Sequence, residues 1–328
     1  MTVSPISRDL QVSVIVAARD AGDDLAHVVR ALERQTFRPS AFEVVIADDG
    51  SQDGSAGALG ADGEWLRVLW APPANPYAAR NRGAASARGE VLAFLDADCH
   101  PEPDWLERGV AALANADLAA GSVLFTTPRR KSVWALVDTE TFLDQERAVL
   151  AGSAVTANLL VRRALFEREG GFDGTLANGG DHEFVSRCVR SGARLVYAAD
   201  AVVWHPTRSS ARAFIGKLWT VNRRHGIRES RNGARPRGAG WRGWLPVVQT
   251  LRNRIGADRP LTLDPRRLEA SGIPTSTWDH VRAIPVIYLL VPYVSAAAQL
   301  VGWWQGRRQR TSGSAGASVP AVAPPETE

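Results

Sequence analysis

The sequence has few of the residues and motifs that mark several common protein classes. Its 328 residues include two cysteines, Cys99 and Cys188, which form neither a CxxC pair nor a Cys/His ligand spacing. A disulfide scaffold is therefore excluded, and a reduced cytosolic compartment is favoured. No G-x-G-x-x-G follows the first apolar run, so a dinucleotide-dependent dehydrogenase fits poorly. We also expect no secretory signal, because Asp9 precedes a short apolar run that Arg19 closes.

The charge is too balanced to identify a polyanionic partner. The chain has 39 basic and 35 acidic residues, for a net charge of +4, and only Lys131 and Lys217 are lysines. This mild excess does not indicate nucleic acid. Hydrophobic residues make up 45% of the chain, which is enough for one large domain or two smaller ones with a sizeable core.

Short apolar runs alternate with helical patterns in the first hundred residues. Buried strands are predicted at 12–18, 42–51, 66–71 and 90–99. Helices are predicted at 23–37 and, after a loop, within 75–87. This alternation predicts an α/β fold with a mostly parallel sheet and helices on both faces.

The next hundred residues predict further mixed structure. We expect a strand, a helix and a Gly turn over 154–174, and a helix over 179–192 with Asp181 near its N-terminus. Over 193–206 we expect a strand, a turn and a second strand that ends at His205.

Acidic clusters follow three of the predicted strands. These are ARDAGDD, DDGSQD and DADCHPEPD. Parallel α/β sheets bind ligands at the carboxyl ends of their strands, so these clusters should meet at one edge. Asp96 and Asp98 could hold a divalent cation against a phosphorylated ligand. The alternative is a strand end capped by polar turn residues.

Five motifs occur in a specific order over residues 10–207. They are VSVIVAARD, VVIADDGSQDG, AARNRGAASARGEVLAFLDADC, ANLLVRRALFEREGGFD and GGDHEFVSRCVRSG. This ordered set resembles the family 2 glycosyltransferases, inverting enzymes of the Rossmann-like GT-A fold. The resemblance implies transfer of a sugar from a UDP-, GDP- or dTDP-linked donor to a hydroxyl acceptor, with Mg²⁺ or Mn²⁺.

The resemblance also implies roles for individual residues. Asp181 would be the general base that takes the proton of the acceptor hydroxyl. Asp98 and His205 would contact the metal. The donor-binding residues would be Ala17, Arg19, Asp48, Asp49, Arg80, Asn81 and Asp96, with Gly83 completing the Arg-Asn-x-Gly element.

The chain departs from the family pattern at two places. Relatives usually carry Pro-x-Tyr-Asn after the first strand, where this chain has Ala-Ala-Arg-Asp at 17–20. Gly180 stands where relatives carry the Glu of a Glu-Asp pair, which makes Glu183 an alternative to Asp181.

Simpler interpretations remain open for single residues. Asp181 could be a helix N-cap, and His205 a strand-end histidine bonded to backbone. We expect Arg187 to be a structural ion-pair partner and Cys99 to be a buried small residue.

The composition changes after residue 222. Residues 223–243 hold seven arginines and one glutamate without an apolar period, which predicts a basic loop. Residues 284–304 carry no charge and are long enough to cross a bilayer. The resulting expectation is a catalytic domain at 1–222, a basic loop at 223–243, a membrane-associated helical segment at 244–310 and a disordered tail at 311–328.

The apolar segment could span the membrane, lie in its interface or be a buried helix. A single span would place the basic flank RRQR on the far side from cytosolic nucleotide sugars, against the positive-inside tendency. Pro285, Pro292 and Gln299 also weaken a simple span. We expect peripheral or monotopic association with the cytoplasmic face. The basic loop would face anionic lipid headgroups or a lipid-diphosphate acceptor, and the alternative is a solvated loop.

The predicted acceptor class is a lipid-linked glycan or cell-envelope polysaccharide precursor. One alternative is a nucleotidyltransferase, although AARDAGDD lacks the Gly-rich signature that such an enzyme needs. The other is a non-catalytic relative that binds nucleotide sugar in a membrane complex.

Overall fold

The computed structural model describes residues 10–60, 63–128, 131–231, 233 and 262–314. The chain forms two compact units. The first consists of Met1–Ser210 with Leu263–Ala283, and the second of Ala211–Thr262 with Ile284–Glu328.

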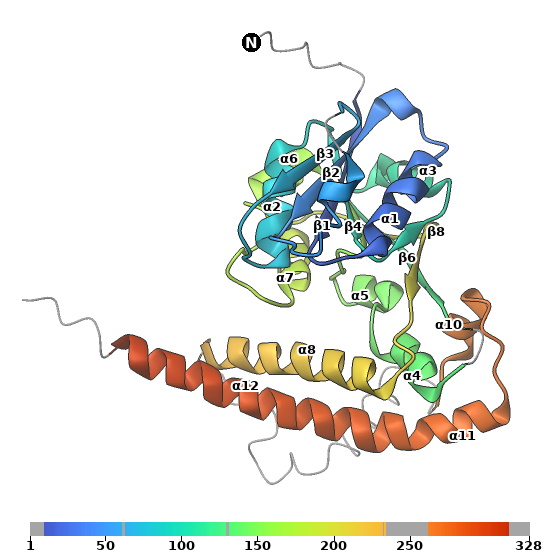
Figure 1. The fold of residues 1–328 in the computed structure, drawn as a ribbon, viewed down its shortest axis with the longest axis vertical. Helices are drawn as coiled ribbons and strands as arrows, with labels where there is room; N and C mark the ends of the chain where they lie inside the picture. Colours follow the sequence, from blue (N-terminus) through green and yellow to red (C-terminus); the bar gives the residue numbers. More distant parts are fainter. Residues whose placement is uncertain (1–9, 61–62, 129–130, 232, 234–261, 315–328) are drawn as a thin grey trace, which may run out of the picture. The chain divides into compact units, whose positions relative to one another are not determined.

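The first unit is built on a mixed sheet of eight strands in the order β3-β2-β1-β4-β7-β6-β8-β5 (Figure 1). In chain order the strands are β1 (Val12–Ala18), β2 (Phe42–Asp48), β3 (Leu66–Trp70), β4 (Val91–Asp96), β5 (His100–Pro101), β6 (Leu118–Thr126), β7 (Asn158–Arg162) and β8 (Leu195–Pro206). The pairs β1–β2, β1–β4, β2–β3 and β6–β8 are parallel. Strand β7 runs antiparallel to β4 and β6, and β5 runs antiparallel to β8.

Helices cover both faces of this sheet, as predicted. The helices that lie wholly or mostly in the first unit are α1 (Asp23–Glu33), α2 (Pro76–Ser86), α3 (Trp105–Ala112), α4 (Val133–Thr141), α5 (Gln145–Leu150), α6 (Arg163–Arg168), α7 (Gly180–Arg190), α10 (Pro265–Ala270) and α11 (Thr277–Pro285). The core has two parts because strand side chains alternate between faces. Val14 packs with Val28 of α1, whereas Ile15 packs with Ala84 of α2 and Phe184 of α7.

A buried polar cluster lies at the N-terminal end of β1, around the carboxylate of Glu43. The Glu43 carboxylate accepts hydrogen bonds from Ser13 Oγ at 2.7 Å and from Arg88 Nε at 2.8 Å, and it pairs with Arg67 at 2.9 Å. Burial acts to raise the pKa of Glu43, but the hydrogen bonds from Ser13 and Arg88 and the charge of Arg67 lower it overall.

Residues 193–206 differ from the prediction. They form one strand, β8, in place of two strands and a turn, and the extra residues make a bulge where the register with β6 shifts between Gly121 and Ser122. The Asn158 side chain fills this bulge: its Nδ2 donates to the carbonyls of Ser122 at 2.9 Å and Ala201 at 2.8 Å. Its Oδ1 accepts from Trp105 Nε1 at 2.9 Å. The Asn158 amide thus replaces the ladder hydrogen bonds that a bulge interrupts.

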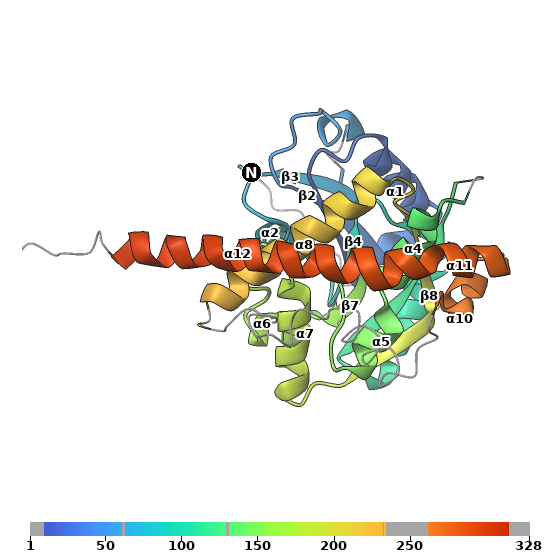
Figure 2. The ribbon, with the colours of Figure 1, turned by 90° about the horizontal axis from the view of Figure 1, so that it is seen from below.

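The second unit contains α8 (Ala211–Arg231), a π-helical turn (Val286–Leu290) and α12 (Val291–Ser314). Helices α8 and α12 lie side by side in Figure 1 and cross in Figure 2. Their contact depends on glycine, because a Cβ on Gly302 would meet the Arg223 carbonyl oxygen and a Cβ on Gly226 would meet that of Gln299.

The helical structure corrects two expectations for this region. Residues 223–231 belong to α8 and not to a loop, and residues 311–314 belong to α12 and not to a disordered tail. The buried positions of α8 are Phe214, Leu218, Gly226 and Ser230, which are separated by multiples of four residues. Arginines between them hid this period from the sequence pattern. Apart from Gly233, the rest of both predicted segments lies outside the described residues.

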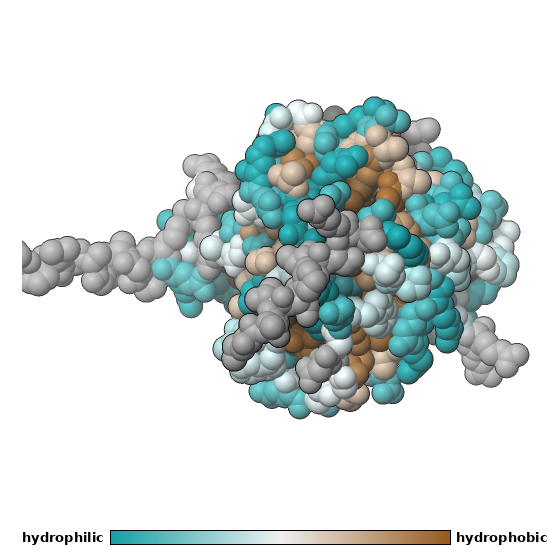
Figure 3. Space-filling model, turned by 90° about the horizontal axis from the view of Figure 1, so that it is seen from above, coloured by the Kyte–Doolittle hydropathy of each residue, from teal (hydrophilic) through white to brown (hydrophobic). Residues whose placement is uncertain are grey.

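The helical segment Thr277–Gln309 contains an 18-residue window with a mean hydropathy of 1.8 and is long and apolar enough to cross a membrane. Only 22% of its most apolar window is buried, which argues against the alternative of a core helix. Its exposed apolar side chains include Leu289, Tyr293, Leu300 and Trp304. By contrast, the face seen in Figure 3 shows hydrophobic residues in separate patches among hydrophilic ones.

Candidate active site

The strand register brings the predicted acidic clusters to one edge of the sheet. At the end of β1, Ala18 lies opposite Asp48 of β2, and Ala17 lies opposite Asp96 of β4. The carboxyl ends of these three neighbouring parallel strands therefore place Asp48 and Asp96 on either side of β1, as the sequence pattern predicts.

The acidic pair after β2 is buried and hydrogen-bonded. Asp48 accepts hydrogen bonds from the backbone N–H and the hydroxyl of Ser51. Asp49 accepts from Ala74 N at 2.9 Å and from Arg82 Nη2 at 3.3 Å. Arg82 was not among the predicted site residues, because a residue two positions beyond Arg80 on α2 does not share its helix face.

Arg80 is joined to the first aspartate of the D-x-D motif. Its Nη2 lies 2.5 Å from Asp96 Oδ1, and its side chain is 7% exposed against 29% for Asp96. The guanidinium carbon also lies 5.6 Å from the centre of the Tyr77 ring. The pair orients Asp96, whose side chain remains partly accessible to a ligand.

Asn81 has a different environment from Arg80. Its Nδ2 donates to the Phe172 carbonyl at 2.7 Å, and its Oδ1 accepts from the Phe172 N–H at 3.0 Å. Both ends of the amide are therefore used to hold the loop after α6. The contact of Asn81 with the donor stays a prediction.

Asp98 and His205 lie together although 107 residues separate them in the chain. His205 Nε2 is 3.3 Å from Asp98 Oδ2, and the two side chains are 4% and 41% exposed. Nδ1 of His205 is buried and has no hydrogen-bond partner among the described residues. The imidazole therefore faces the carboxylate and not a backbone group.

This pair fits a divalent cation that also binds a diphosphate. Mg²⁺ usually retains waters and takes one or two carboxylates together with substrate phosphates. Imidazole is a further common ligand for transition metals. No group of three such side chains is gathered in the described part of the chain, so phosphate oxygens and water would complete the coordination.

Asp181 lies in the first turn of α7. The N-cap position is held by Gly179 at φ 71°, so the interpretation of Asp181 as the N-cap is wrong. Asp181 Oδ1 accepts from the Tyr77 hydroxyl and from the His182 N–H, both at 3.0 Å. A carboxylate is favoured there because the positive end of the helix dipole is close.

The alternative base, Glu183, is committed to an ion pair. Its Oε1 lies 2.9 Å from Arg187 Nε, and Arg187 also donates to the Gly171 carbonyl at 2.8 Å. Arg187 is thus the structural partner that the sequence predicted, and Asp181 is the more available carboxylate.

Cys99 is fully buried, and burial with the nearby charges of Asp96 and Asp98 raises the pKa of its thiol, so a nucleophilic role is disfavoured.

The loop after β1 is tied to the loop after β2. The Asp20 N–H donates to Ser51 Oγ at 3.0 Å, and Asp20 Oδ1 accepts from Gln52 N at 2.7 Å. The Gly22 N–H donates to Asp53 Oδ2 at 2.8 Å. Arg19 is exposed beside this clamp.

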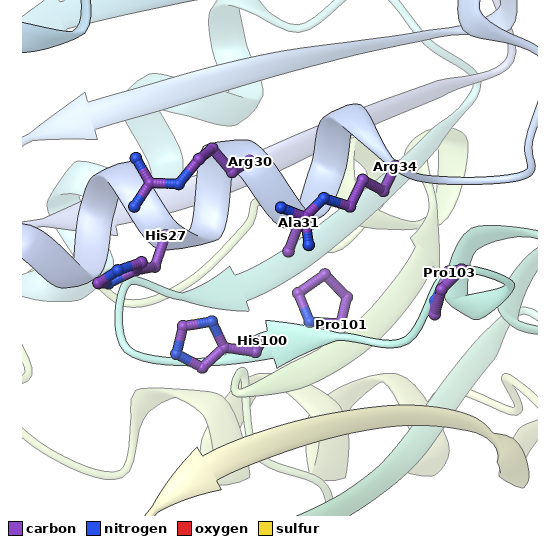
Figure 4. A pocket seen from close by; sticks show the side chains of 7 residues that line it. All are labelled: His27, Arg30, Ala31, Arg34, His100, Pro101 and Pro103. Carbon is purple, nitrogen blue, oxygen red and sulfur yellow. The ribbon is translucent and has the colours of Figure 1, made fainter.

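A cationic pocket of about 270 Å³ lies between α1 and the β5 segment (Figure 4). The rings of His27 and His100 meet edge to face with their centres 6.0 Å apart. The remaining lining residues are Arg30, Ala31, Arg34, Pro101 and Pro103. None of the predicted site residues lines this pocket.

The sequence is similar to known proteins of one family. Residues 13–170 match the family model described as Glycosyl transferase family 2. The chain is 34% identical over 204 residues to Glycosyltransferase AglE of Haloferax volcanii, covering 60% of this chain and 67% of that protein. The chain belongs to glycosyl transferase family 2. Membership of this family argues against the alternative that the protein is a nucleotidyltransferase.

Other relatives of this glycosyltransferase are covered less completely. It is 30% identical to Pre-mycofactocin glycosyltransferase of Mycobacterium tuberculosis, with 65% of this chain and 46% of that protein covered. It is 31% identical to Succinoglycan biosynthesis protein ExoU of Rhizobium meliloti, with 56% and 58% covered. The chain therefore spans about half to two thirds of these relatives' lengths.

A solved structure agrees in fold. Mannosyltransferase PcManGT from Pyrobaculum calidifontis, in complex with GDP-Man and Mn2+, superposes with a TM-score of 0.50 at 18% identity. The match covers 94% of this chain and 81% of that one. At this identity the likeness supports the GT-A-like mixed sheet alone.

Proposed function

We propose that the protein transfers one sugar from a nucleotide-sugar donor to a hydroxyl acceptor with inversion at the anomeric carbon. The observation that carries the proposal is the grouping of two distinct functions at one sheet edge. Asp98 and His205 lie together and would hold a cation, and the Asp181 carboxylate is linked to the same edge through Tyr77, Arg80 and Asp96.

The donor would lie along the ends of β2, β1 and β4. Asp48 and Asp49 would contact the base and ribose, with Ala17 and Arg19 beside them, and Asp96 would contact ribose or sugar. A divalent cation on Asp98 and His205 would supply charge neutralisation for the departing diphosphate. The cation would be Mg²⁺ or Mn²⁺, as the resemblance to the family implies.

The acceptor hydroxyl would approach from the side of α7. Asp181 would take its proton as the acceptor oxygen attacks the anomeric carbon opposite the leaving diphosphate. General base catalysis of this kind contributes about 100- to 10,000-fold to a rate. UDP- and GDP-sugars are the first donors to test, since GDP-Man and UDP-GlcNAc are bound in the structures of fold neighbours.

The acceptor class that we propose is a lipid-linked glycan or a polysaccharide precursor at the cytoplasmic membrane face. Relatives named for succinoglycan and O-antigen biosynthesis support this class. The exposed apolar side chains of Thr277–Gln309 would enter the interface in a monotopic mode. The arginines of α8 would lie near anionic headgroups.

The proposal is tested with Asp98→Ala and Asp181→Asn, with Asp104→Asn as a surface control. Nucleoside diphosphate release is measured from UDP-glucose, UDP-GlcNAc and GDP-mannose with Mn²⁺ and octyl glycosides as acceptors. We expect Asp181→Asn to lose about 100-fold or more in turnover while its nucleotide binding is retained. Asp98→Ala should also lose the increase in thermal stability that UDP or GDP with Mn²⁺ gives the wild type.

Wild-type turnover in both variants would show that the mechanism is wrong. Unchanged stabilisation by nucleotide and Mn²⁺ in Asp98→Ala would show that the cation site is elsewhere.

A further inference from the structure

We propose that Tyr77 is a positioning residue that fixes the carboxylate of Asp181 for catalysis, an inference that rests on the proposed role of Asp181 as general base. The Tyr77 hydroxyl donates to Asp181 Oδ1 at 3.0 Å from α2, 104 residues earlier in the chain. Tyr77 is 6% exposed, and its ring packs against Phe172 with the ring centres 5.7 Å apart. The hydroxyl that donates this hydrogen bond is therefore held in place by the packing of the Tyr77 ring.

The two carboxylate oxygens of Asp181 have unequal surroundings. Oδ1 accepts from Tyr77 and from the His182 N–H. In the described part of the chain, Oδ2 has one long contact, from the Thr156 N–H at 3.4 Å. Two good donors on one oxygen set the orientation of the carboxylate and leave Oδ2 as the oxygen that would take the acceptor proton.

The lack of a side chain at Gly180 is a second, independent feature that fits the position of the Tyr77 ring. A Cβ at this position would lie 2.8 Å from the Tyr77 ring, which is closer than real contacts allow. The ring thus occupies the space in which a side chain at position 180 would begin. The departure from the family's Glu-Asp pair is explained, because Tyr77 and a glutamate at position 180 exclude each other.

Tyr77 also connects Asp181, the proposed general base, to residues that would bind the nucleotide sugar. The Arg80 guanidinium carbon lies 5.6 Å from the Tyr77 ring centre, and Arg80 pairs with Asp96. Burial, followed by the charge of Asp181, raises the pKa of the Tyr77 hydroxyl above its usual value of 10. The phenol therefore stays protonated and remains a hydrogen-bond donor throughout the neutral range.

The test is the Tyr77→Phe variant, which keeps the ring and removes only the hydroxyl. The matched control is Tyr197→Phe, on the half-buried tyrosine of β8. We expect kcat with UDP-glucose, UDP-GlcNAc or GDP-mannose and octyl glycoside acceptors to fall about tenfold, as loss of a hydrogen bond to a charged group does. KM for the donor should be unchanged.

The pH profile separates positioning from a merely structural effect. A hydrogen bond donated to a carboxylate favours its charged form, so the acidic limb of the kcat profile should move to higher pH in Tyr77→Phe. Gly180→Ala should lower kcat in the same way by displacing the ring. An unchanged kcat and acidic limb in Tyr77→Phe would overturn the inference.

Failure of the inference can be told apart from failure of the proposed function. If Asp181→Asn abolishes turnover while Tyr77→Phe has none of the expected effects, only the role of Tyr77 is wrong. If Asp181→Asn retains turnover, the proposed function itself fails. A thermal-unfolding cycle needs no activity: the Tyr77→Phe, Asp181→Asn pair should destabilise by less than the sum of the single changes. Additive changes would contradict the hydrogen bond.

Discussion

Replacing Asn158 should destabilise the protein far more than the loss of one polar side chain suggests. The side chain is fully buried between β6, β8 and α3, and it serves three partners: the Trp105 N–H and the carbonyls of Ser122 and Ala201. In Asn158→Leu all three would remain buried without a partner. Each such group costs about 1–3 kcal/mol, so we expect a loss of about 4 kcal/mol after the lower desolvation of leucine is included.

That loss would be a large fraction of the roughly 5–15 kcal/mol that stabilises a typical domain. The assay is urea unfolding followed by far-UV circular dichroism, with Asn115→Ala as the control because Asn115 is exposed. The control should change stability by less than about 0.5 kcal/mol.

The same variant should weaken the cation site. Asn158 holds the bulge that precedes the last part of β8, where His205 lies opposite Phe125 of β6. A slip of one residue would turn His205 to the other face of the sheet. We expect the thermal stabilisation by Mn²⁺ with UDP or GDP to decrease. A loss of less than about 1 kcal/mol with full stabilisation by Mn²⁺ would refute the reasoning, because three unsatisfied groups cannot cost so little.

Two further predictions concern pH and membranes. The folded pKa of Glu43 lies below its usual value of 4.5, since hydrogen bonds such as that from Arg88 outweigh the effect of burial. Its contribution is therefore full above that usual value and is lost as pH falls through the folded pKa, so the Tm of Glu43→Gln should lie well below that of the wild type at pH 7, and the difference should shrink as pH falls below 4.5. For the membrane, the paired change Leu300→Asp and Trp304→Asp should reduce cosedimentation with phosphatidylglycerol vesicles by about tenfold or more, because each side chain is exposed and apolar. Gln305→Asp should have little effect, and equal binding by all variants would contradict an interfacial role for α12.

The sequence predicted most reliably those strands that appear as apolar runs in the local pattern. The apolar runs predicted β1, β2, β3 and β4, and the register of parallel strands then brings Asp48 and Asp96 together without further information. The family pattern also indicated the pair of Asp98 and His205, which lie on elements far apart in the chain.

Contacts made only in the tertiary structure could not be predicted in this way. The interaction of Tyr77 with Asp181 joins two helices, and nothing in the local spacing of either helix indicates it. The bulge in β8 was mistaken for a turn because Ala199 to Ala201 contain no apolar alternation. Helix α8 was missed because its contact with α12 is made at Gly226, a residue that the hydrophobic pattern does not count.

The clamp between the loops after β1 and β2 has a consequence for exchanging segments with relatives. Asp20 adopts a positive φ of 48° and is held there by Ser51 and Gln52. The unusual residues after β1 and the acidic loop after β2 are therefore one interlocking part. A chimaera that receives the first loop of a relative should retain a well-formed donor site only when it receives the second loop as well.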